Sequence, residues 1–143
     1  VGGVGYVSAE LRVPFRAQRA GWDYSYGFYD PESNGANGSF RWASGRAAAV
    51  VPVSEDLIEL SVWTHHPDVA LHPVELKVWL DGELVMDSVR TDREPVGRTM
   101  RRPIDQDSVV IETWVSRTWK PSDYGQEDSR ELGVGVRWRS YDP

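Results

Sequence analysis

The clearest pattern in the chain is a strict alternation of aliphatic with polar or aromatic residues. In residues 57–64, Ile58, Leu60 and Val62 alternate with Glu, Ser and Trp, and residues 74–80 repeat the same period. A period of two residues is typical of a strand with one buried face, whereas a helix would need a spacing of three to four. Both segments are therefore predicted to be half-buried β-strands.

Further strands follow from the same pattern. Asp81-Gly82 tolerates the positive φ angles of a tight turn, so residues 83–89 are predicted to return as the partner of 74–80 in a β-hairpin. Residues 108–119 form the longest strand candidate, and residues 132–139 supply a late strand.

The first third of the chain is less regular. Residues 4–13 and 40–53 have β-rich composition, and Ser44-Gly45 predicts a turn that splits the second segment into two strands. Turn pairs such as Asn34-Gly35 lie between these segments, so a long irregular loop is expected at about 24–39.

The predicted fold class is all-β. Helical turns are expected at most in residues 54–57 and 122–131, because no segment combines helix caps with an apolar stripe over three turns. Roughly eight to ten short strands joined by turns favour a two-sheet antiparallel β-sandwich, jelly-roll-like, with residues 1–143 as a single domain.

Net charge and composition limit the classes of partner that this chain is expected to bind. The formal net charge is −6, and a nucleic-acid partner is not expected because phosphate binding needs a clustered basic surface. The chain has no Cys and no apolar run long enough for a membrane helix, so neither a disulfide framework nor direct membrane insertion is predicted. It begins at Val1 and not at Met, which favours a fragment of a longer protein.

Several short motifs occur in a characteristic order. They are Gly27-Phe28-Tyr29 with Glu32, Phe40-Arg41-Trp42, Ala47-Ala48-Ala49, His66-Pro67-Asp68, Pro73-Val74, Asp81-Gly82, Val115-Ser116-Arg117-Thr118-Trp119-Lys120-Pro121 and Arg130-Glu131-Leu132-Gly133. Over about residues 24–138 this order resembles a bacterial accessory β-sandwich family, carbohydrate-binding-like jelly rolls attached to glycosyltransferases and multi-pass membrane proteins of cell-surface glycan assembly. The resemblance implies a glycan context and assigns no ligand residue. The sequence leaves both cytosol and periplasm open, and an extracytoplasmic or cell-envelope association is favoured.

Three tryptophans are candidate sugar platforms. Trp63, Trp79 and Trp114 lie on the strand faces opposite the aliphatic residues, and a flat indole suits the C–H face of a sugar ring. The alternative is that another protein covers this face or that each indole packs into the sandwich, since large aromatic side chains are mostly buried.

A second candidate set surrounds the predicted loop. Tyr29 and Trp42 would add aromatic surface there, with Glu32, Arg41 and Arg117 as hydrogen-bonding partners of a glycan. Arginine–carboxylate pairs more often tie a loop to its scaffold, so a purely structural role is the competing interpretation. The loop set implies a pocket at the rim and the three tryptophans imply a sheet face, and the pattern alone does not choose between them.

Metal binding and catalysis receive little support. His65 and His66 are adjacent and would point to opposite sides of an extended chain, so no metal centre is predicted. Oxygen-bearing residues between Asp30 and Asn37 leave a structural Ca²⁺ open, although turn chemistry explains them without an ion. The spacing selects no catalytic pair or nucleophile, so the domain is not expected to be an enzyme.

The leading hypothesis is a non-catalytic, carbohydrate-binding-like accessory module of a bacterial cell-envelope or glycan-processing protein. The alternative is a docking or assembly sandwich that has no sugar ligand and binds a neighbouring protein domain through its Trp-bearing face.

Overall fold

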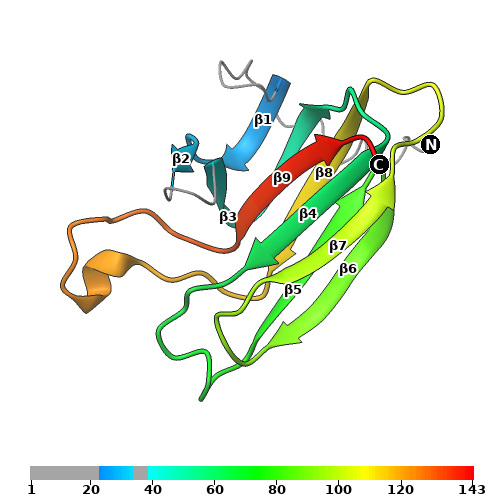
Figure 1. Ribbon diagram of the computed structural model, residues 1–143. Coiled ribbons are helices and arrows are strands. Elements are labelled where there is room, and N and C mark those ends of the chain that lie inside the picture. The colour runs from blue at the N-terminus through cyan, green and yellow to red at the C-terminus, as the bar shows by residue number, and fades with distance from the viewer. Residues whose placement is uncertain (1–22, 34–38) are drawn as a thin grey trace.

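The computed structural model describes residues 23–33 and 39–143, and this part of the chain is almost entirely β-structure (Figure 1). The strands are β1 (Asp23–Phe28), β2 (Glu32–Ser33), β3 (Ser39–Pro52), β4 (Leu57–Trp63), β5 (Val74–Leu80), β6 (Glu83–Arg90), β7 (Val96–Arg101), β8 (Ser108–Val115) and β9 (Gly135–Tyr141). A short 3-10 helix, η3 (Pro121–Tyr124), follows β8. No helix of the described residues is long and apolar enough to cross a membrane.

The strands form two facing sheets, and every described pairing is antiparallel. The first sheet has the order β6-β5-β8-β3-β1, and the second runs from the start of β3 through β9 and β4 to β7. Figure 1 shows β9, β4 and β7 in front of β8, β5 and β6. The predicted all-β sandwich of two antiparallel sheets is confirmed.

Strand β3 belongs to both sheets. Its residues Arg41 and Trp42 pair with β9, whereas the stretch from Arg46 to Pro52 pairs with β8. The prediction of a turn at Ser44-Gly45 is therefore wrong, because this dipeptide marks the place where one continuous strand changes its partner.

The expected loop at about 24–39 is also shorter than predicted. β1 occupies residues 23–28 and pairs with β3, and the two residues of β2 pair with the beginning of β3. Residues 34–38, which carry the strongest turn signals, and the candidate strand 4–13 lie outside the described residues. The sequence missed β1 because Tyr24–Phe28 has no aliphatic alternation, and its pairing with β3 is a tertiary contact.

Hairpin chemistry at Asp81-Gly82 agrees with the prediction. Both residues have positive φ angles, 49° for Asp81 and 85° for Gly82, as a type I′ turn requires. The Asp81 carboxylate accepts a hydrogen bond from the Val110 amide at 2.8 Å, which ties the turn to the adjacent strand β8. The hairpin therefore sits at the edge of the first sheet with a fixed register.

The aliphatic residues of the alternating strands fill the space between the sheets. Ile58, Leu60 and Val62 from β4 face Val74, Leu76, Val78, Val109 and Ile111 from β5 and β8, and all are at most 1% exposed. β7 is an edge strand with mostly exposed residues and no aliphatic stripe, so no periodic pattern predicts it. Arg98 of β7 donates a hydrogen bond to the Val85 carbonyl of β6, and so links the two outer strands.

The core makes a direct stability prediction. Leu60→Ala removes a side chain with no exposed surface and is expected to lower the free energy of unfolding by about 2–5 kcal/mol. Val89→Ala is the matched control, because Val89 is 60% exposed on β6 and should cost less than about 1 kcal/mol. Urea denaturation checks both variants, and equal losses would contradict the described core.

Candidate functional site

Strand β4 ends beside the start of β9 in the second sheet (Figure 1). An aromatic cluster lies at this end of the sheet. Gly135 is the partner of Trp42 across β3 and β9, and also of Trp63 across β4 and β9. The two tryptophans therefore flank a glycine on the outer face of the sheet. A β-carbon on Gly135 would overlap the Trp63 indole, so the indole can pack against the strand only because residue 135 has no side chain.

The rings contact one another closely. Trp42 and Trp63 have ring centroids 6.3 Å apart, and Phe40 lies 5.9 Å from Trp42 and 5.5 Å from Trp63. His65 stands edge-on to Trp42 at 5.3 Å. Trp42 and Trp63 are only 7% and 5% exposed, so they form the floor of the cluster, while His65 is exposed above them. Such edge-to-face pairs add stability beyond burial of area alone.

Two adjoining pockets open over this cluster, and together they are called the aromatic groove. The arginine pocket, about 420 Å³, is lined by Phe40, Trp42, Trp63, His65, Arg93, Pro95 and Arg137. The loop pocket, about 390 Å³, is lined by Glu32, Trp42, His65, Pro67, Arg93, Trp119, Pro121, Tyr124, Gln126, Asp128, Arg130 and Leu132. Both volumes fall within the range of small-molecule sites, and Trp42, His65 and Arg93 are common to both pockets.

The arginine pocket is aromatic and cationic. The Arg137 guanidinium lies over the Trp63 ring, 5.2 Å from its centroid, which is the geometry of a cation–π contact. Arg93 and Pro95 come from the segment between β6 and β7 and are exposed. Burial lowers the pKa of His65, and the nearby charge of Arg93 lowers it further, so its imidazole is neutral at pH 7.

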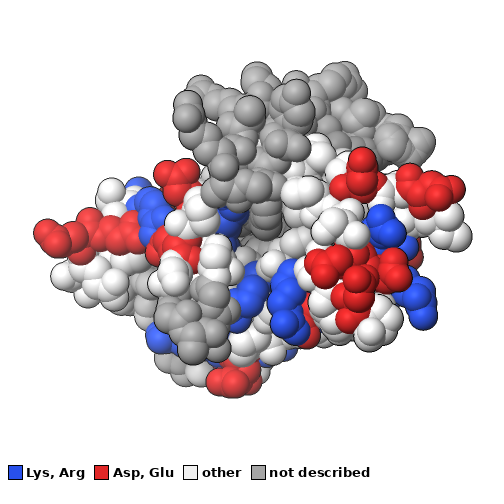
Figure 2. Space-filling model, turned by 45° about the horizontal axis from the view of Figure 1, so that its top comes forward, with Lys and Arg blue, Asp and Glu red and all other residues white. Residues whose placement is uncertain are grey.

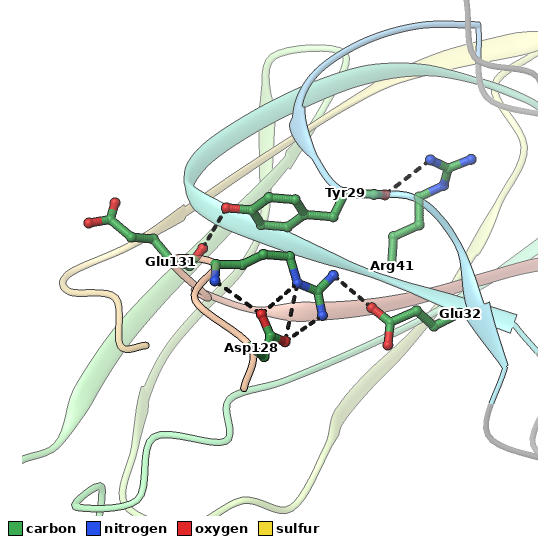
Figure 3. A network of polar contacts seen from close by, with 6 residues as sticks. Tyr29, Glu32, Arg41, Asp128 and Glu131 are labelled. Carbon is green, nitrogen blue, oxygen red and sulfur yellow. Dashed lines mark hydrogen bonds and ion pairs between the residues drawn. The ribbon is translucent and has the colours of Figure 1, made fainter. Parts of the chain in front are cut away.

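The wall of the loop pocket is held by a network of polar contacts (Figure 3). The Arg130 guanidinium donates hydrogen bonds of 2.8 to 3.2 Å to the Asp128 carboxylate and one of 2.9 Å to the carboxylate of Glu32 on β2. The same guanidinium lies 5.1 Å from the centroid of the Tyr29 ring, and the Tyr29 hydroxyl donates to the Glu131 carbonyl. The segment after η3 is thereby fastened to β2 and the residues before it.

This network also sets the charge state of its members. The hydrogen bonds that Arg130 donates lower the pKa of the Asp128 carboxyl, and their acceptance by the Asp128 and Glu32 carboxylates raises the pKa of Arg130. Burial is the main cause that lowers the pKa of Arg41, whose guanidinium donates to the Tyr29 carbonyl at 3.2 Å. Asp128 is therefore not held in the protonated form that a general acid needs near neutral pH.

Arg117 ties the segment after β8 to the loop after β4. Its guanidinium donates to Asp68 at 2.9 Å and to the His72 carbonyl at 2.6 Å. Its own carbonyl accepts a 2.7 Å hydrogen bond from Nε2 of the fully buried His66. The contacts of Arg117 are thus those of a loop anchor, and they fit the structural interpretation of this residue.

The predicted site residues divide into two groups. Tyr29, Glu32, Arg41, Trp42 and Trp63 gather around the aromatic groove. The remaining tryptophans, Trp79 of β5 and Trp114 of β8, are half-buried on the outer face of the first sheet.

The prediction that the three strand tryptophans share one sheet face is therefore wrong. Each does point away from the aliphatic core of its own strand, as expected, but Trp63 belongs to β4 of the second sheet. Alternation along a strand identifies the outward side, and it carries no information on which of the two sheets the strand joins.

Sequence reasoning missed most of the arginine pocket. Phe40, Arg93, Pro95 and Arg137 were not candidates, and His65 was considered only as a metal ligand. Arg93 and Pro95 lie in a turn with no periodic signal, and Arg137 follows Gly135 by two residues on the same strand face. Only the register of β9 against β4 brings Arg137 beside Trp63.

The described residues contain no group of three or more His, Asp or Glu side chains arranged to hold a metal ion. The Ca²⁺ hypothesis depends largely on residues 34–38, outside the described part, and stays a prediction. Figure 2 shows acidic and basic side chains interspersed over the visible face, without a broad basic surface. The charge pattern there is unlike that of a nucleic-acid-binding face.

Comparison with known proteins gives structural similarities only. No family model and no curated protein matches the sequence. The CBM51-2 and INT domains of Clostridium perfringens ZmpB, solved in complex with GlcNAc, align with a TM-score of 0.41 and 18% identity over 77% of this chain and 25% of theirs. A family 35 carbohydrate-binding module of Clostridium thermocellum aligns with a TM-score of 0.39 and 13% identity, over 82% of this chain and 91% of that module.

The GH31 alpha-xylosidase of Xanthomonas citri aligns with a TM-score of 0.37 and 14% identity over 73% of this chain. The chain spans a tenth of that enzyme and a quarter of the ZmpB structure. Similarity at this level assigns no ligand and no activity to this chain.

The glycine between the two tryptophans gives a stability prediction. Gly135→Ala forces the Trp63 indole off the strand and is expected to lower the free energy of unfolding by about 1–3 kcal/mol. Gly97→Ala is the matched control on the neighbouring edge strand, where a β-carbon meets only ordinary contact at 3.8 Å. Chemical denaturation of both variants checks this, and an unchanged midpoint for Gly135→Ala would contradict the described packing.

The buried imidazole of His66 predicts a pH dependence of stability. Burial lowers its pKa in the folded state below the ordinary value of 6.5, so the unfolded chain binds the proton more readily. Stability is then full above pH 6.5 and is lost progressively as the pH falls from there towards the folded-state pKa. Asp68 and Asp128 have pKa values lowered from 3.8, so loss through them begins only at more acidic pH.

Thermal unfolding between pH 8 and pH 5 measures this effect. His66→Gln should flatten the dependence near pH 6, while His72→Gln should leave most of it, because the His72 side chain is exposed. A wild-type stability that does not change across this range would contradict the burial of a neutral His66.

Proposed function

We propose that this domain is a non-catalytic module that binds a carbohydrate in the aromatic groove. The observation that supports it is the combination of an aromatic floor, Trp42 and Trp63, with hydrogen-bonding side chains around it. Sugar rings combine apolar C–H faces with a rim of hydroxyl groups, so a site for them needs aromatic surface and polar groups together.

The chemistry of the groove favours binding over catalysis. Glycoside hydrolysis uses two carboxyl groups on either side of the scissile bond, one of them protonated. Glu32 and Asp128 are the carboxylates that line the groove, and both are paired with the same guanidinium of Arg130. Because Arg130 holds the pKa of Asp128 down, Asp128 lacks the proton that an acid catalyst would supply.

The wider context belongs to the same proposal. The ordered motifs resemble accessory sandwiches of bacterial glycosyltransferases and membrane proteins of glycan assembly, and several of those motifs line or anchor the groove. Trp42, Trp119 and Arg130 line it, while Arg117 ties down the loop beneath it. We therefore place the domain beside a bacterial cell-envelope or glycan-processing protein, where it would hold a glycan near a partner domain.

A glycan array followed by isothermal titration calorimetry tests the proposal. Trp42→Phe and Trp63→Phe shorten the aromatic floor while keeping a ring in place, and each should weaken binding about two- to tenfold. Trp79→Phe and Trp114→Phe are the matched controls on the other sheet and should leave the affinity unchanged. Circular dichroism confirms that each variant is folded.

The competing docking role predicts a different result. Absence of binding to every glycan on a broad array would contradict carbohydrate binding and favour a module that packs against another protein. A loss of sugar binding in Trp79→Phe or Trp114→Phe, with Trp42→Phe and Trp63→Phe unaffected, would move the site to the outer face of the first sheet.

A further inference from the structure

The arginine pocket carries a local positive charge on a chain with a net charge of −6. Among the described residues that line it, Arg93, Arg137 and His65 are the titratable side chains, and none is Asp or Glu. The loop pocket differs, because its Arg130 is already paired with both of the carboxylates that line it. The two halves of the groove therefore offer a ligand different charges.

Arg93 stands out among the arginines around the groove. Arg117 has the carboxylate partner Asp68 at 2.9 Å, and Arg130 is paired with Asp128 and Glu32. The exposed Arg93 makes no ion pair or hydrogen bond within residues 23–33 and 39–143. Its guanidinium is thus available at the junction of the two pockets.

The acidic neighbours of Arg93 along the chain do not line the arginine pocket. The carboxylate of Asp92 accepts hydrogen bonds from Arg90 and from the Glu94 amide, each at 3.0 Å. The carbonyl of Glu94 also accepts from Arg90, at 3.1 Å. These bonds fix the turn that carries Arg93, so the guanidinium is presented from an ordered segment.

We infer that the ligand of the arginine pocket is an acidic glycan, whose sugar ring lies against Trp42 and Trp63 while its negatively charged group pairs with Arg93. This inference rests on the proposed carbohydrate function and adds the class of sugar. A planar guanidinium binds a carboxylate or a sulfate through two parallel hydrogen bonds, which a neutral sugar cannot match. Arg137, stacked on Trp63, adds positive charge on the far side of the same pocket.

Matched acidic and neutral ligands test the inference by titration calorimetry. Oligogalacturonate and its methyl ester differ in charge and in one methyl group per esterified residue, and chondroitin sulfate against unsulfated chondroitin separates sulfate from carboxylate recognition. At least one acidic member should bind about tenfold or more tightly than its neutral or less charged partner. Its affinity should also fall as salt is raised, because exposed charges are screened.

Substitutions identify the residue that pairs with the negatively charged group of the glycan. Arg93→Gln should weaken binding of the acidic ligand about tenfold or more and remove the preference over the neutral partner. Arg101→Gln is the matched control, since it removes the same charge from an exposed position at the other end of β7, outside both pockets. It should leave both affinities unchanged.

The outcomes separate this inference from the function on which it rests. Equal binding of acidic and neutral glycans, with no effect of Arg93→Gln, would overturn the acidic ligand and leave carbohydrate binding in place. Absence of binding to every glycan, acidic or neutral, would overturn both. Acidic preference that survives Arg93→Gln would contradict the assignment of Arg93 as the residue that pairs with the charge.

Discussion

The sharing of β3 between the two sheets is the constraint on which the rest of the architecture depends. Residues 46–52 pair with β8 in the first sheet, and Arg41 and Trp42 pair with β9 in the second. Backbone hydrogen bonds on both sides of the bend hold the sheets face to face, and their inward aliphatic residues then exclude water from one core. Because β3 changes sheets just after Trp42, that indole comes to lie on the outer face of the second sheet, beside Gly135.

The candidate site is a consequence of this crossing. Trp42 comes from β3, Trp63 from the end of β4, and Gly135 from the first residue of β9, so three segments far apart in sequence meet there. The long return from β8 to β9 then closes one side, held by the Trp119–Leu132 bridge and by the pairing of Arg130 with Glu32. The same residues therefore pack the end of the sheet and line the groove. A substitution that tests binding has to keep an aromatic ring at Trp42 or Trp63 so that this packing is preserved.

The charges of the groove follow from local pairing. Arg117 and Arg130 are paired with carboxylates within the fold, and these pairs fasten loops whose backbone would otherwise be free to move. Their energetic contribution to stability is modest because the side chains are partly exposed, with 33% for Arg130 and 34% for Arg117. Arg93 has no such partner among the described residues, so its positive charge is exposed at the surface of the groove, where a ligand would bind.

The sequence by itself determined the fold class, the strands 57–64 and 74–80, the turn at Asp81-Gly82 and the outward direction of each strand tryptophan. All of these depend on interactions between residues close in the chain, such as alternation and backbone φ preference. Tertiary structure alone decided that β3 is continuous, that β7 completes the second sheet, and that Trp63 joins Trp42 while Trp79 and Trp114 lie elsewhere. Strand partners and register are set by contacts between distant segments, and no local pattern encodes which sheet a strand will enter.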